Sequence, residues 1–566
     1  MRLINKISAT TAFTVALIFE LSAQNLPSSV TQRIDSLFSQ WNNRNSPGCA
    51  IGIVRNDSLV YANAYGSANL EYQIPLTETS LFNIASLSKQ FTGYAIAMLV
   101  NKGLVDLDKD VRSYLPWVPN LKAKITVKDL LHHTSGLRDH LAMALWGGIG
   151  YDGLITQDYA KKYISHYKDL NFPPGENHSY SNSNYVLLAE IIKTISGKSF
   201  KDYMDSAVFK PLGMKHSFFI DQPSALIKNK TESYRSIGNA QYANVFQNVF
   251  TNGDGGIYSN IVDLAKWVGN FQHQKLGTAD DMALFLSSGK LNDSTLLNYA
   301  MGIGDLTHKG FRQLTHGGGL AGYRTRITVY PELKLGFIVL SNLSNIAAGM
   351  KADQLAELFL TEHSKVTKAV APQILDTTKS FLGDTSRAKE LVGTYLADDG
   401  LKAECWFTNL KLYWRYYGRP VLLIEKDKDK FAMATDTTVK FHFLNQSGNR
   451  TVHQFEYGYK RKFQEYHVDS TLTDKEMMNY TGIYYSSELD LRIEITKNNK
   501  GLLLKSFKHG ESLIKPLTKN DFFNQTGGTY FNFLRNAKKE IIGFEVSTGP
   551  LFHLRFDKLL GLKNKE

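Results

Sequence analysis

The sequence predicts an α+β fold whose last third forms two antiparallel β-barrel repeats. Amphipathic helices and short strands are mixed over roughly the first 365 residues, as expected for an α+β domain. From about residue 389 the pattern changes to short aromatic strands interleaved with charges, and it recurs after about 90 residues. The chain of 566 residues is long enough for these units, and its 43% hydrophobic content is typical of globular proteins.

The N-terminal segment is predicted to be a secretory signal. Arg2 and Lys6 precede a mostly apolar stretch over residues 7–21, and a small residue, Ala23, follows it. A charged start, a short apolar run and a small residue at the cleavage point are typical of a signal peptide, here residues 1–23. An uncleaved N-terminal anchor is the alternative. We therefore expect a secreted or periplasmic protein of the bacterial envelope, with no stable membrane span after signal removal.

The distribution of charge argues against a nucleic-acid partner. The net charge is +12, but the lysines are scattered and form no basic stripe interleaved with aromatic residues. Cys49 and Cys405 fall in different predicted domains, so we expect two small buried side chains rather than a disulfide. The adjacent His132 and His133 face different directions, which favours structural use in a tight turn over a metal site. No cofactor and no metal are expected.

The first elements follow from periodicity and turn residues. Residues 30–41 have the apolar spacing of an amphipathic helix, and residues 49–54 and 58–62 form a β-hairpin with a polar turn between them. After the helix that begins at Ser86, residues 125–131 form a short helix capped by a threonine. These elements belong to the mixed domain.

The helix that begins at Ser86 carries the first candidate site. Apolar residues recur on one face from Leu87 to Leu99, which predicts a helix packed on a core. Ser86 and Lys89 lie three residues apart, so their side chains share a face away from that stripe. A hydroxyl, an amine to take its proton and free N–H groups at a helix N-terminus are the parts of an activated nucleophile. A lone Ser-x-x-Lys pair, however, is usually a solvated helix face.

Two further polar sites lie beside predicted elements. Tyr180-Ser181-Asn182 directly precedes an amphipathic helix over residues 186–196, although this composition is also common in turns. In His316-Gly317-Gly318-Gly319, the three glycines would let the backbone of a ligand lie close, although such a loop can also be simply flexible. The elements expected after this motif are strands over 326–330 and 335–340 and a helix over 347–360.

Together these motifs resemble those of a known superfamily. Ser86-Leu87-Ser88-Lys89, Tyr180-Ser181-Asn182 and His316-Gly317-Gly318 occur in the order and rough spacing of the active-site motifs of serine β-lactamases and penicillin-binding proteins. The sequence is most similar to the class C branch, which includes D-aminopeptidases, D,D-carboxypeptidases and esterases. The resemblance implies a β-lactamase/transpeptidase-like domain over residues 24–367, with an antiparallel sheet flanked by helices plus an all-helical subdomain.

The resemblance also implies catalytic roles. Ser86 would attack a carbonyl and form an acyl-enzyme, and Lys89 would take or relay its proton. Tyr180 would act as the second general base and as the acid toward the leaving group. His316 would occupy the position of the third motif's cation, where it would help orient Tyr180 or bind an acidic group.

The implied substrate-binding residues are Asn182, Gly318 and Gly319. Asn182 would hold the amide of the substrate, and the backbone N–H groups of Ser86 and Gly319 would form the oxyanion hole. Two features depart from β-lactamases: a histidine, His316, replaces the usual lysine of the third motif, and no clear deacylating carboxylate is found. Efficient β-lactam hydrolysis is therefore not expected, while acylation of Ser86 by a β-lactam stays open.

The two barrel repeats are predicted over residues 388–470 and 471–566, after a linker over 368–387. The matching residues are Gly393 with Gly482, Leu410 and Leu412 with Leu502 and Leu504, Phe441 and Phe443 with Phe531 and Phe533, and Phe455 with Phe544. The strand spacing is that of an up-and-down barrel and resembles the lipocalin-like domains appended to D-aminopeptidases of this family. The repeats either shape the active-site cleft or serve stability or adhesion.

The sequence thus predicts an exported serine hydrolase that cleaves amide bonds through an acyl-enzyme. Peptides that contain D-amino acids are the leading substrate class. A carboxylesterase on the same site and a penicillin-binding sensor with little turnover are the alternatives. The expected partner is a small peptide or ester.

Overall fold

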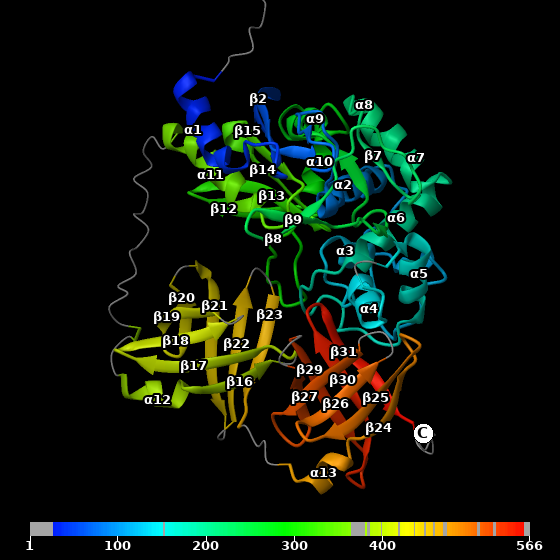
Figure 1. Cartoon of the computed structure of the whole chain (residues 1–566), viewed down its shortest axis with the longest axis vertical. Coiled ribbons are helices and arrows are strands. Elements are labelled where there is room, and N and C mark those ends of the chain that lie inside the picture. The colour runs from blue at the N-terminus through cyan, green and yellow to red at the C-terminus, as the bar shows by residue number, and fades with distance from the viewer. Residues whose placement is uncertain are drawn as a thin grey trace, which may run out of the picture.

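The computed structural model describes residues 26–150, 153–363, 380–381, 385–397, 399–416, 419–434, 436–446, 449–456, 459–467, 472–506, 510–524 and 528–559. The predicted signal 1–23 and most of the predicted linker 368–387 lie outside these residues. The described chain forms a mixed α/β domain and two barrels beneath it (Figure 1). The predicted fold class is confirmed.

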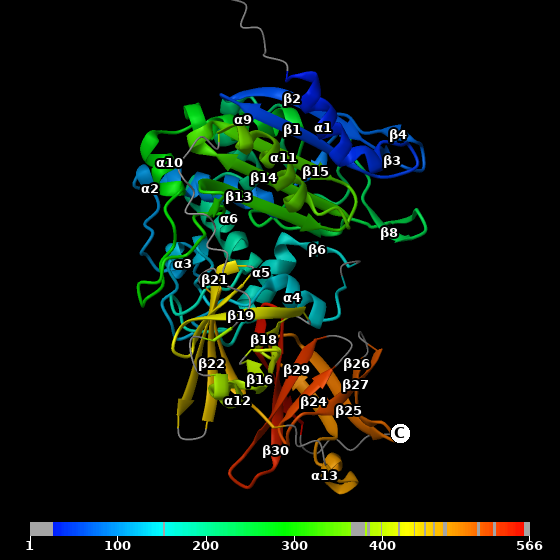
Figure 2. The same ribbon diagram turned by 90° about the vertical axis from the view of Figure 1, so that its left-hand side faces the viewer.

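A six-stranded antiparallel sheet forms the centre of the mixed domain, in the order β12-β13-β14-β15-β1-β2. Figure 2 labels five of these strands, β1, β2, β13, β14 and β15, in the upper part of the molecule. Its strands are β1 (Cys49–Arg55), β2 (Ser58–Tyr65), β12 (Gly304–His308), β13 (Phe311–Leu320), β14 (Tyr323–Tyr330) and β15 (Leu335–Ser341). The predicted hairpin of β1 and β2 is confirmed, and its turn residues Asn56 and Asp57 both have positive φ, 49° and 64°. Such turns match the twist of the two strands.

Helices cover both faces of this sheet. On one face, α1 (Ser28–Phe38) and α11 (Ala348–His363) pack over Cys49, Ile51 and Ile53, and on the other α9 (Ile261–His273) packs against β1 and β15. Both faces of β1 are therefore buried, which explains its continuous apolar sequence. Cys49 and Cys405 are buried free thiols, as predicted, and burial raises the pKa of both.

The helical subdomain is built around α2 (Ser88–Asn101). Its other helices are α3 (Val127–Leu131), α4 (His140–Trp146), α5 (Gln157–His166), α6 (Asn182–Ser196), α7 (Phe200–Met204), α8 (Lys210–Leu212) and α10 (Ala279–Phe285). The apolar stripe predicted for α2 covers only one side of the helix, but every residue from Ser88 to Leu99 is buried, because α6, α9 and α10 pack around it. The polar side of the helix therefore faces the protein interior rather than solvent.

Short strands complete the mixed domain. They are β3 (Ser67–Asn69), β4 (Ile74–Pro75), β5 (Phe82–Asn83), β6 (Ile155–Thr156), β7 (Phe218–Phe219), β8 (Tyr234–Gly238), β9 (Gln241–Asn244), β10 (Val249–Phe250) and β11 (Ile257–Ser259). β5 leads directly into the turn that carries Ser86 and pairs with β11. None of the helices in the described part of the chain has the length and hydrophobicity that a membrane crossing requires.

The C-terminal third forms two closed up-and-down barrels of eight strands each. The first contains α12 (Ala388–Leu391), β16 (Gly393–Ala397), β17 (Lys402–Thr408), β18 (Lys411–Tyr416), β19 (Arg419–Asp427), β20 (Lys430–Met433), β21 (Asp436–Gln446), β22 (Asn449–Glu456) and β23 (Tyr459–Glu465). The second contains α13 (Asp474–Met478), β24 (Gly482–Ser486), β25 (Leu491–Asn498), β26 (Gly501–Ser506), β27 (Gly510–Pro516), β28 (Asp521–Asn524), β29 (Thr529–Arg535), β30 (Ile541–Thr548) and β31 (Leu551–Lys558).

The internal repeat predicted from the sequence corresponds to equivalent strands. Gly393 and Gly482 begin the first strands of the two barrels, and Phe441 and Phe531 lie in the sixth strands. Phe441, Phe443, Phe531, Phe533 and Phe544 fill the barrel interiors, as a closed small barrel requires. Phe455, which was predicted to match Phe544, is only partly buried and lies outside the core of the first barrel. Phe381, from the predicted linker, packs on Phe407 and Phe431 of the first barrel.

The second barrel packs against the helical subdomain near α4 (Figure 1). The Trp146 ring lies 6.3 Å from that of Phe531 and 6.1 Å from that of Phe556. The first barrel contacts the mixed domain through Asn177 and Lys460, whose side-chain amide and backbone exchange two hydrogen bonds of 2.8 and 2.9 Å. The barrels are therefore docked onto the domain that carries the candidate site.

Candidate active site

Ser86 lies in a single turn of 3₁₀ helix, Ala85–Leu87, that leads directly into α2. The preceding Ala85 has a φ of 49°, a left-handed conformation that costs energy for a residue with a side chain. The Asn83 Oδ1 atom accepts a 2.8 Å hydrogen bond from the Ala85 N–H, and the Thr325 hydroxyl donates to the Ile84 carbonyl at 2.9 Å. These contacts from β5 and β14 hold the strained turn and fix the position of the serine.

Lys89 is completely buried and lies one turn after the serine. Its Nζ is 3.2 Å from Ser86 Oγ, 2.8 Å from Asn182 Oδ1 and 2.6 Å from the carbonyl oxygen of Asp254. The last two atoms can only accept, so the amine must donate one hydrogen to each of them. A neutral amine has two hydrogens and one lone pair, so with both hydrogens used its lone pair faces the serine hydroxyl.

Burial lowers the pKa of Lys89 to about 8, although the charges of Asp254 and Asp139 act in the opposite direction. A substantial fraction of the amine is therefore neutral near physiological pH. In this state Ser86 donates its proton toward Nζ, which is the direction that nucleophilic attack requires.

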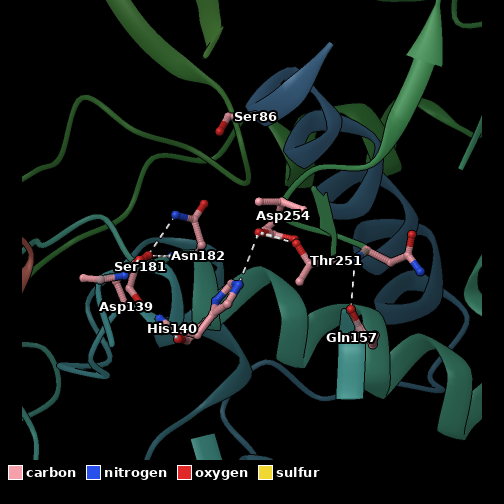
Figure 3. A network of polar contacts seen from close by, with 12 residues as sticks. Ser86, Asp139, His140, Gln157, Ser181, Asn182, Thr251 and Asp254 are labelled. Atoms are coloured by element: carbon pink, nitrogen blue, oxygen red, sulfur yellow. Dashed lines mark hydrogen bonds and ion pairs between the residues drawn. The ribbon is translucent and has the colours of Figure 1, made fainter. Parts of the chain in front are cut away.

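Asn182 is held by Asp139, a residue that the sequence did not point to. The Asp139 Oδ2 atom accepts hydrogen bonds from the Asn182 backbone N–H at 2.6 Å and from its Nδ2 at 2.8 Å (Figure 3). Because Nδ2 is committed to Asp139, the Oδ1 atom must point at Lys89. Asp139 thus determines which way the amide of Asn182 is turned.

Tyr180 lies beside the lysine, with the Lys89 Nζ 4.8 Å from the centre of its ring. Its hydroxyl is buried, and among the described residues it has no hydrogen-bond partner of good geometry. Burial raises the pKa of the phenol well above 10, although its proximity to the Ser86 hydroxyl lowers it somewhat. The phenol therefore stays protonated at neutral pH, which suits it to donate a proton.

The ring of His133 packs against the ring of Tyr180. The two rings are 4.3 Å apart, and His133 Nδ1 accepts hydrogen bonds from the Ser181 N–H at 3.2 Å and the Asn184 Nδ2 at 3.1 Å. His133 has a φ of 56° and is buried, and burial is the main cause that lowers its pKa. This histidine therefore supports the Tyr180 loop as a neutral structural residue.

His316 is a neutral imidazole in this structure. Its Nδ1 lies 2.6 Å from the Gly317 carbonyl, which can only accept, so Nδ1 carries the proton and Nε2 accepts from the Tyr299 hydroxyl at 3.0 Å. Burial, followed by the charge of Lys89, lowers the pKa of His316 to about 3. The residue takes the predicted place beside Tyr180, with ring centres 6.3 Å apart, but it brings no positive charge.

Gly318 and Gly319 face different surroundings because side-chain positions alternate along β13. A Cβ atom at Gly318 would lie 2.2 Å from the Ile84 carbonyl oxygen, so only glycine lets β13 approach the turn that carries Ser86. Gly319 lines the same cavity as Ser86, whereas Gly318 lines a smaller neighbouring pocket. Gly318 therefore packs against the nucleophile turn instead of facing the ligand cavity.

The cavity in front of Ser86 has a volume of about 1290 Å³ and is shared between domains. The mixed domain contributes Ser86, Tyr180, Asn182, Trp146, Phe246, Gly319 and Arg324, and the second barrel contributes Leu504, Glu511, Ser512, Asn524, Thr529 and Phe531. A volume of this size accommodates a short peptide. The second barrel is thus one wall of the candidate active site, a point on which the sequence left two alternatives open.

Asp254 and His140 form a buried pair beneath the lysine. The His140 Nε2 atom lies 3.9 Å from Asp254 Oδ2, which also accepts a 3.1 Å hydrogen bond from Thr251 (Figure 3). Burial raises the pKa of Asp254, and the charges of His140 and Lys89 lower it. In the sequence Asp254 lies in a glycine-rich stretch, Gly253-Asp254-Gly255-Gly256. Its contact with Lys89 is made by the backbone carbonyl, which the residue type does not indicate. Among the described residues no cluster of side chains suits a metal ion.

The fold and this serine–lysine–tyrosine site define an active-site serine hydrolase with a β-lactamase-like domain. A family model described as Beta-lactamase matches residues 32–360, and the chain belongs to this family. A D-aminopeptidase of Gluconobacter oxydans (strain 621H) is 27% identical over 311 residues, which cover 55% of this chain and 58% of the relative. The chain thus matches little more than half the length of that enzyme.

Two further similarities cover more of the molecule. Penicillin-binding protein 4* of Bacillus subtilis (strain 168) is 27% identical over 413 residues, which cover 69% of this chain and 88% of the relative. The structure of an octameric penicillin-binding protein homologue from Pyrococcus abyssi is similar with a TM-score of 0.52 and 22% identity, over 77% of this chain and 99% of that one. At 22% identity, the similarity to the Pyrococcus abyssi structure concerns the fold alone.

Proposed function

We propose that the protein is an exported hydrolase that cleaves amide bonds in short peptides containing D-amino acids, through an acyl-enzyme on Ser86. The observation that carries the proposal is the Lys89 amine, 3.2 Å from Ser86 Oγ with both of its neutral-state hydrogens committed elsewhere. The similarity to a D-aminopeptidase supports the substrate class. The predicted signal over residues 1–23 supports export.

In the first step Ser86 would attack the amide carbonyl while its proton moves to Lys89. The oxyanion would be stabilised by the backbone N–H groups of Ser86 and of Gly319, which both line the cavity. Tyr180, kept protonated by burial, would then give its proton to the leaving amine and recover one from Lys89. The base of the first step is thus Lys89, and the phenol supplies the acid.

Hydrolysis of the acyl-enzyme would use the same two groups. Asp139 lines the cavity, but its carboxylate accepts from Asn182 and from the Ala142 N–H at 3.0 Å, so it is committed to structure. Glu511 also lines the cavity, on the second barrel, but its carboxylate pairs with the Lys505 amine at 2.9 Å. We therefore assign water activation to Lys89 and Tyr180 by the reverse of the first step.

The second barrel would limit the substrate to short peptides by closing one side of the cavity. Trp146, Phe246 and Phe531 provide an apolar part of the lining, which suits a hydrophobic side chain of the substrate. Glu511 and Asn524 add polar groups on the barrel side. A long polypeptide would collide with this wall.

A fluorophosphonate probe tests the nucleophile directly. The wild-type protein should form a covalent adduct at Ser86, and Ser86→Ala should form none, because the hydroxyl is the attacking group. Intact-mass spectrometry measures both, and Ser88→Ala is the matched control, since Ser88 is buried in α2. Hydrolysis of D- and L-amino-acid amides then tests the substrate class. Equal labelling of wild type and Ser86→Ala would disprove the mechanism.

The labelling rate should rise with pH and level off above about 8, because Lys89 is the base and burial lowers its pKa to about 8. The sign follows from the amine: it accepts a proton only when neutral, which is the form present above its pKa. Asp254→Asn should move the midpoint to lower pH, since it removes a negative charge that favours the protonated amine. The pH profiles of the two labelling rates measure this shift, and identical profiles would contradict it.

The similarity to penicillin-binding protein 4* favours a second candidate, a protein that is acylated by β-lactams with little turnover. Intact-mass spectrometry after addition of a penicillin distinguishes the two. A long-lived adduct together with no amide hydrolysis would favour the second candidate over the first.

A further inference from the structure

Arg138 is a fully buried cation at the contact between the helical subdomain and the second barrel. Its guanidinium donates to the Glu488 carboxylate at 3.0 Å and to the backbone carbonyls of Phe552 at 3.3 Å and His553 at 3.1 Å. All three acceptors belong to the second barrel. One more bond, to the Asp169 carbonyl at 2.6 Å, returns to the mixed domain. The side chain of Arg138 is thus anchored mainly in the barrel.

The backbone of the same residue holds the second active-site motif. The Arg138 carbonyl accepts hydrogen bonds from the hydroxyls of Ser181 at 3.2 Å and Ser183 at 2.7 Å, the residues on either side of Asn182. The next residue, Asp139, binds Asn182 through two further hydrogen bonds. A continuous chain of contacts therefore links the barrel to the lysine. Glu488 binds the Arg138 side chain, and the next residue, Asp139, binds Asn182. Asn182 in turn accepts a hydrogen bond from Lys89.

The position of the Arg138 side chain depends on the barrel, because the barrel supplies the carboxylate that neutralises its charge. Glu488 is the carboxylate that pairs with Arg138 within the described residues, and it also accepts the Lys168 N–H at 3.2 Å. A buried arginine that loses its carboxylate is left uncompensated and shifts toward water or other acceptors. Such a shift would move the Arg138 peptide group, and with it Asp139 and Asn182.

We propose that Arg138 and Glu488 are positioning residues through which the docked second barrel holds Asn182, and hence Lys89, in the reacting geometry. The hydrolase domain then reaches its full rate only with the barrel in place. This inference rests on the proposed function, because it concerns the same Ser86 chemistry. It adds that the barrel contributes to the rate of reaction as well as to the shape of the cavity.

The test measures covalent labelling of Ser86 by a small fluorophosphonate. Arg138→Lys keeps the charge but cannot reach all four acceptors, and Glu488→Ala removes the pairing carboxylate. Both should lower the maximal labelling rate by about 10- to 100-fold, as displacements of about 1 Å do in active sites, with a smaller change in probe affinity. Glu488→Gln, which keeps a hydrogen-bond acceptor but removes the charge, should lower the rate less than Glu488→Ala does.

Asn171→Ala is the matched control. Asn171 also docks the second barrel, donating to the Pro550 carbonyl at 2.9 Å and accepting from the Phe552 N–H at 3.0 Å, but within the described part of the chain its side chain makes no hydrogen bond to the Tyr180–Asn182 motif. Its loss should lower the melting temperature while leaving the labelling rate near that of the wild type. The variants are compared at equal folded fraction, measured by circular dichroism.

Two outcomes would overturn the inference: Arg138→Lys labels as fast as the wild type, or Asn171→Ala loses as much rate as Arg138→Lys. If Glu488→Ala does not fold, the labelling rates of Arg138→Lys and Glu488→Gln test the inference instead. Both substitutions keep a hydrogen-bonding group at the contact, so these variants are more tolerant of the change. Failure of the wild type to label at all would instead overturn the proposed function. The two failures are therefore distinguishable in one experiment.

Discussion

Replacing Lys89 with methionine should lower the rate of Ser86 acylation by roughly 10³-fold or more, the range expected when an activating base is lost. Methionine keeps the length of the buried side chain but has no lone pair of comparable basicity to accept the serine proton. The Asn182 Oδ1 atom and the Asp254 carbonyl also lose their donor. The measurement is the labelling rate with a fluorophosphonate, together with kcat/KM on an amino-acid amide.

The control for this substitution is Lys266→Met. Lys266 is partly buried and donates to the Gly213 carbonyl and to Asp263, away from the cavity that Ser86 lines. It should change the melting temperature but not the labelling rate of the folded protein. A Lys89→Met variant that labels within a few-fold of the wild type would remove Lys89 as the base.

Tyr180→Phe should have an effect that depends on the leaving group. With an amide, loss of the protonated phenol should lower kcat by about 10²- to 10⁴-fold, the usual contribution of a general acid. With a p-nitrophenyl ester, whose leaving group departs without a proton, the loss should be much smaller. The ratio of the two rates therefore reports proton donation rather than general damage to the site.

Tyr185→Phe serves as the comparison for Tyr180→Phe. Tyr185 is equally buried and close to Lys89, at 5.6 Å from Nζ to the ring centre, but its hydroxyl donates to the Leu131 carbonyl. It should lower both rates by a similar, small factor. Equal losses on amide and ester for Tyr180→Phe would show that the phenol is not the acid.

Much of the fold was predictable because local patterns and tertiary structure agree. The β1–β2 hairpin, the helix after Ser86 and the strands around Pro331 all follow from periodicity and turn residues. The repeat of about 90 residues correctly indicated two barrels, since each barrel is a meander of consecutive strands and needs no long-range pairing other than its closure. The predicted stripe of α2 was too narrow, because neighbouring helices cover its polar side as well.

The candidate site was predictable only for residues that belong to short motifs. Ser86 and Lys89 lie one helical turn apart, so their proximity follows from the helix itself. Asp139 and Arg138 carry no local signal, because their roles arise from contacts with Asn182 and with a barrel that lies more than 300 positions later in the sequence. Residues that meet only through tertiary packing have no regular spacing in the sequence by which they could be recognised.

The sequence by itself determined the order of the elements, the three polar motifs and the identity of the groups that can react. Tertiary structure alone decided the protonation state of these groups: burial lowers the pKa of His316, at the position where the third motif of the family usually carries a cation, to about 3, and lowers that of Lys89 to about 8. It also decided that the second barrel forms a wall of the cavity. The physical reason is that protonation and cavity shape depend on what surrounds a group in space, which the order of residues along the chain does not state.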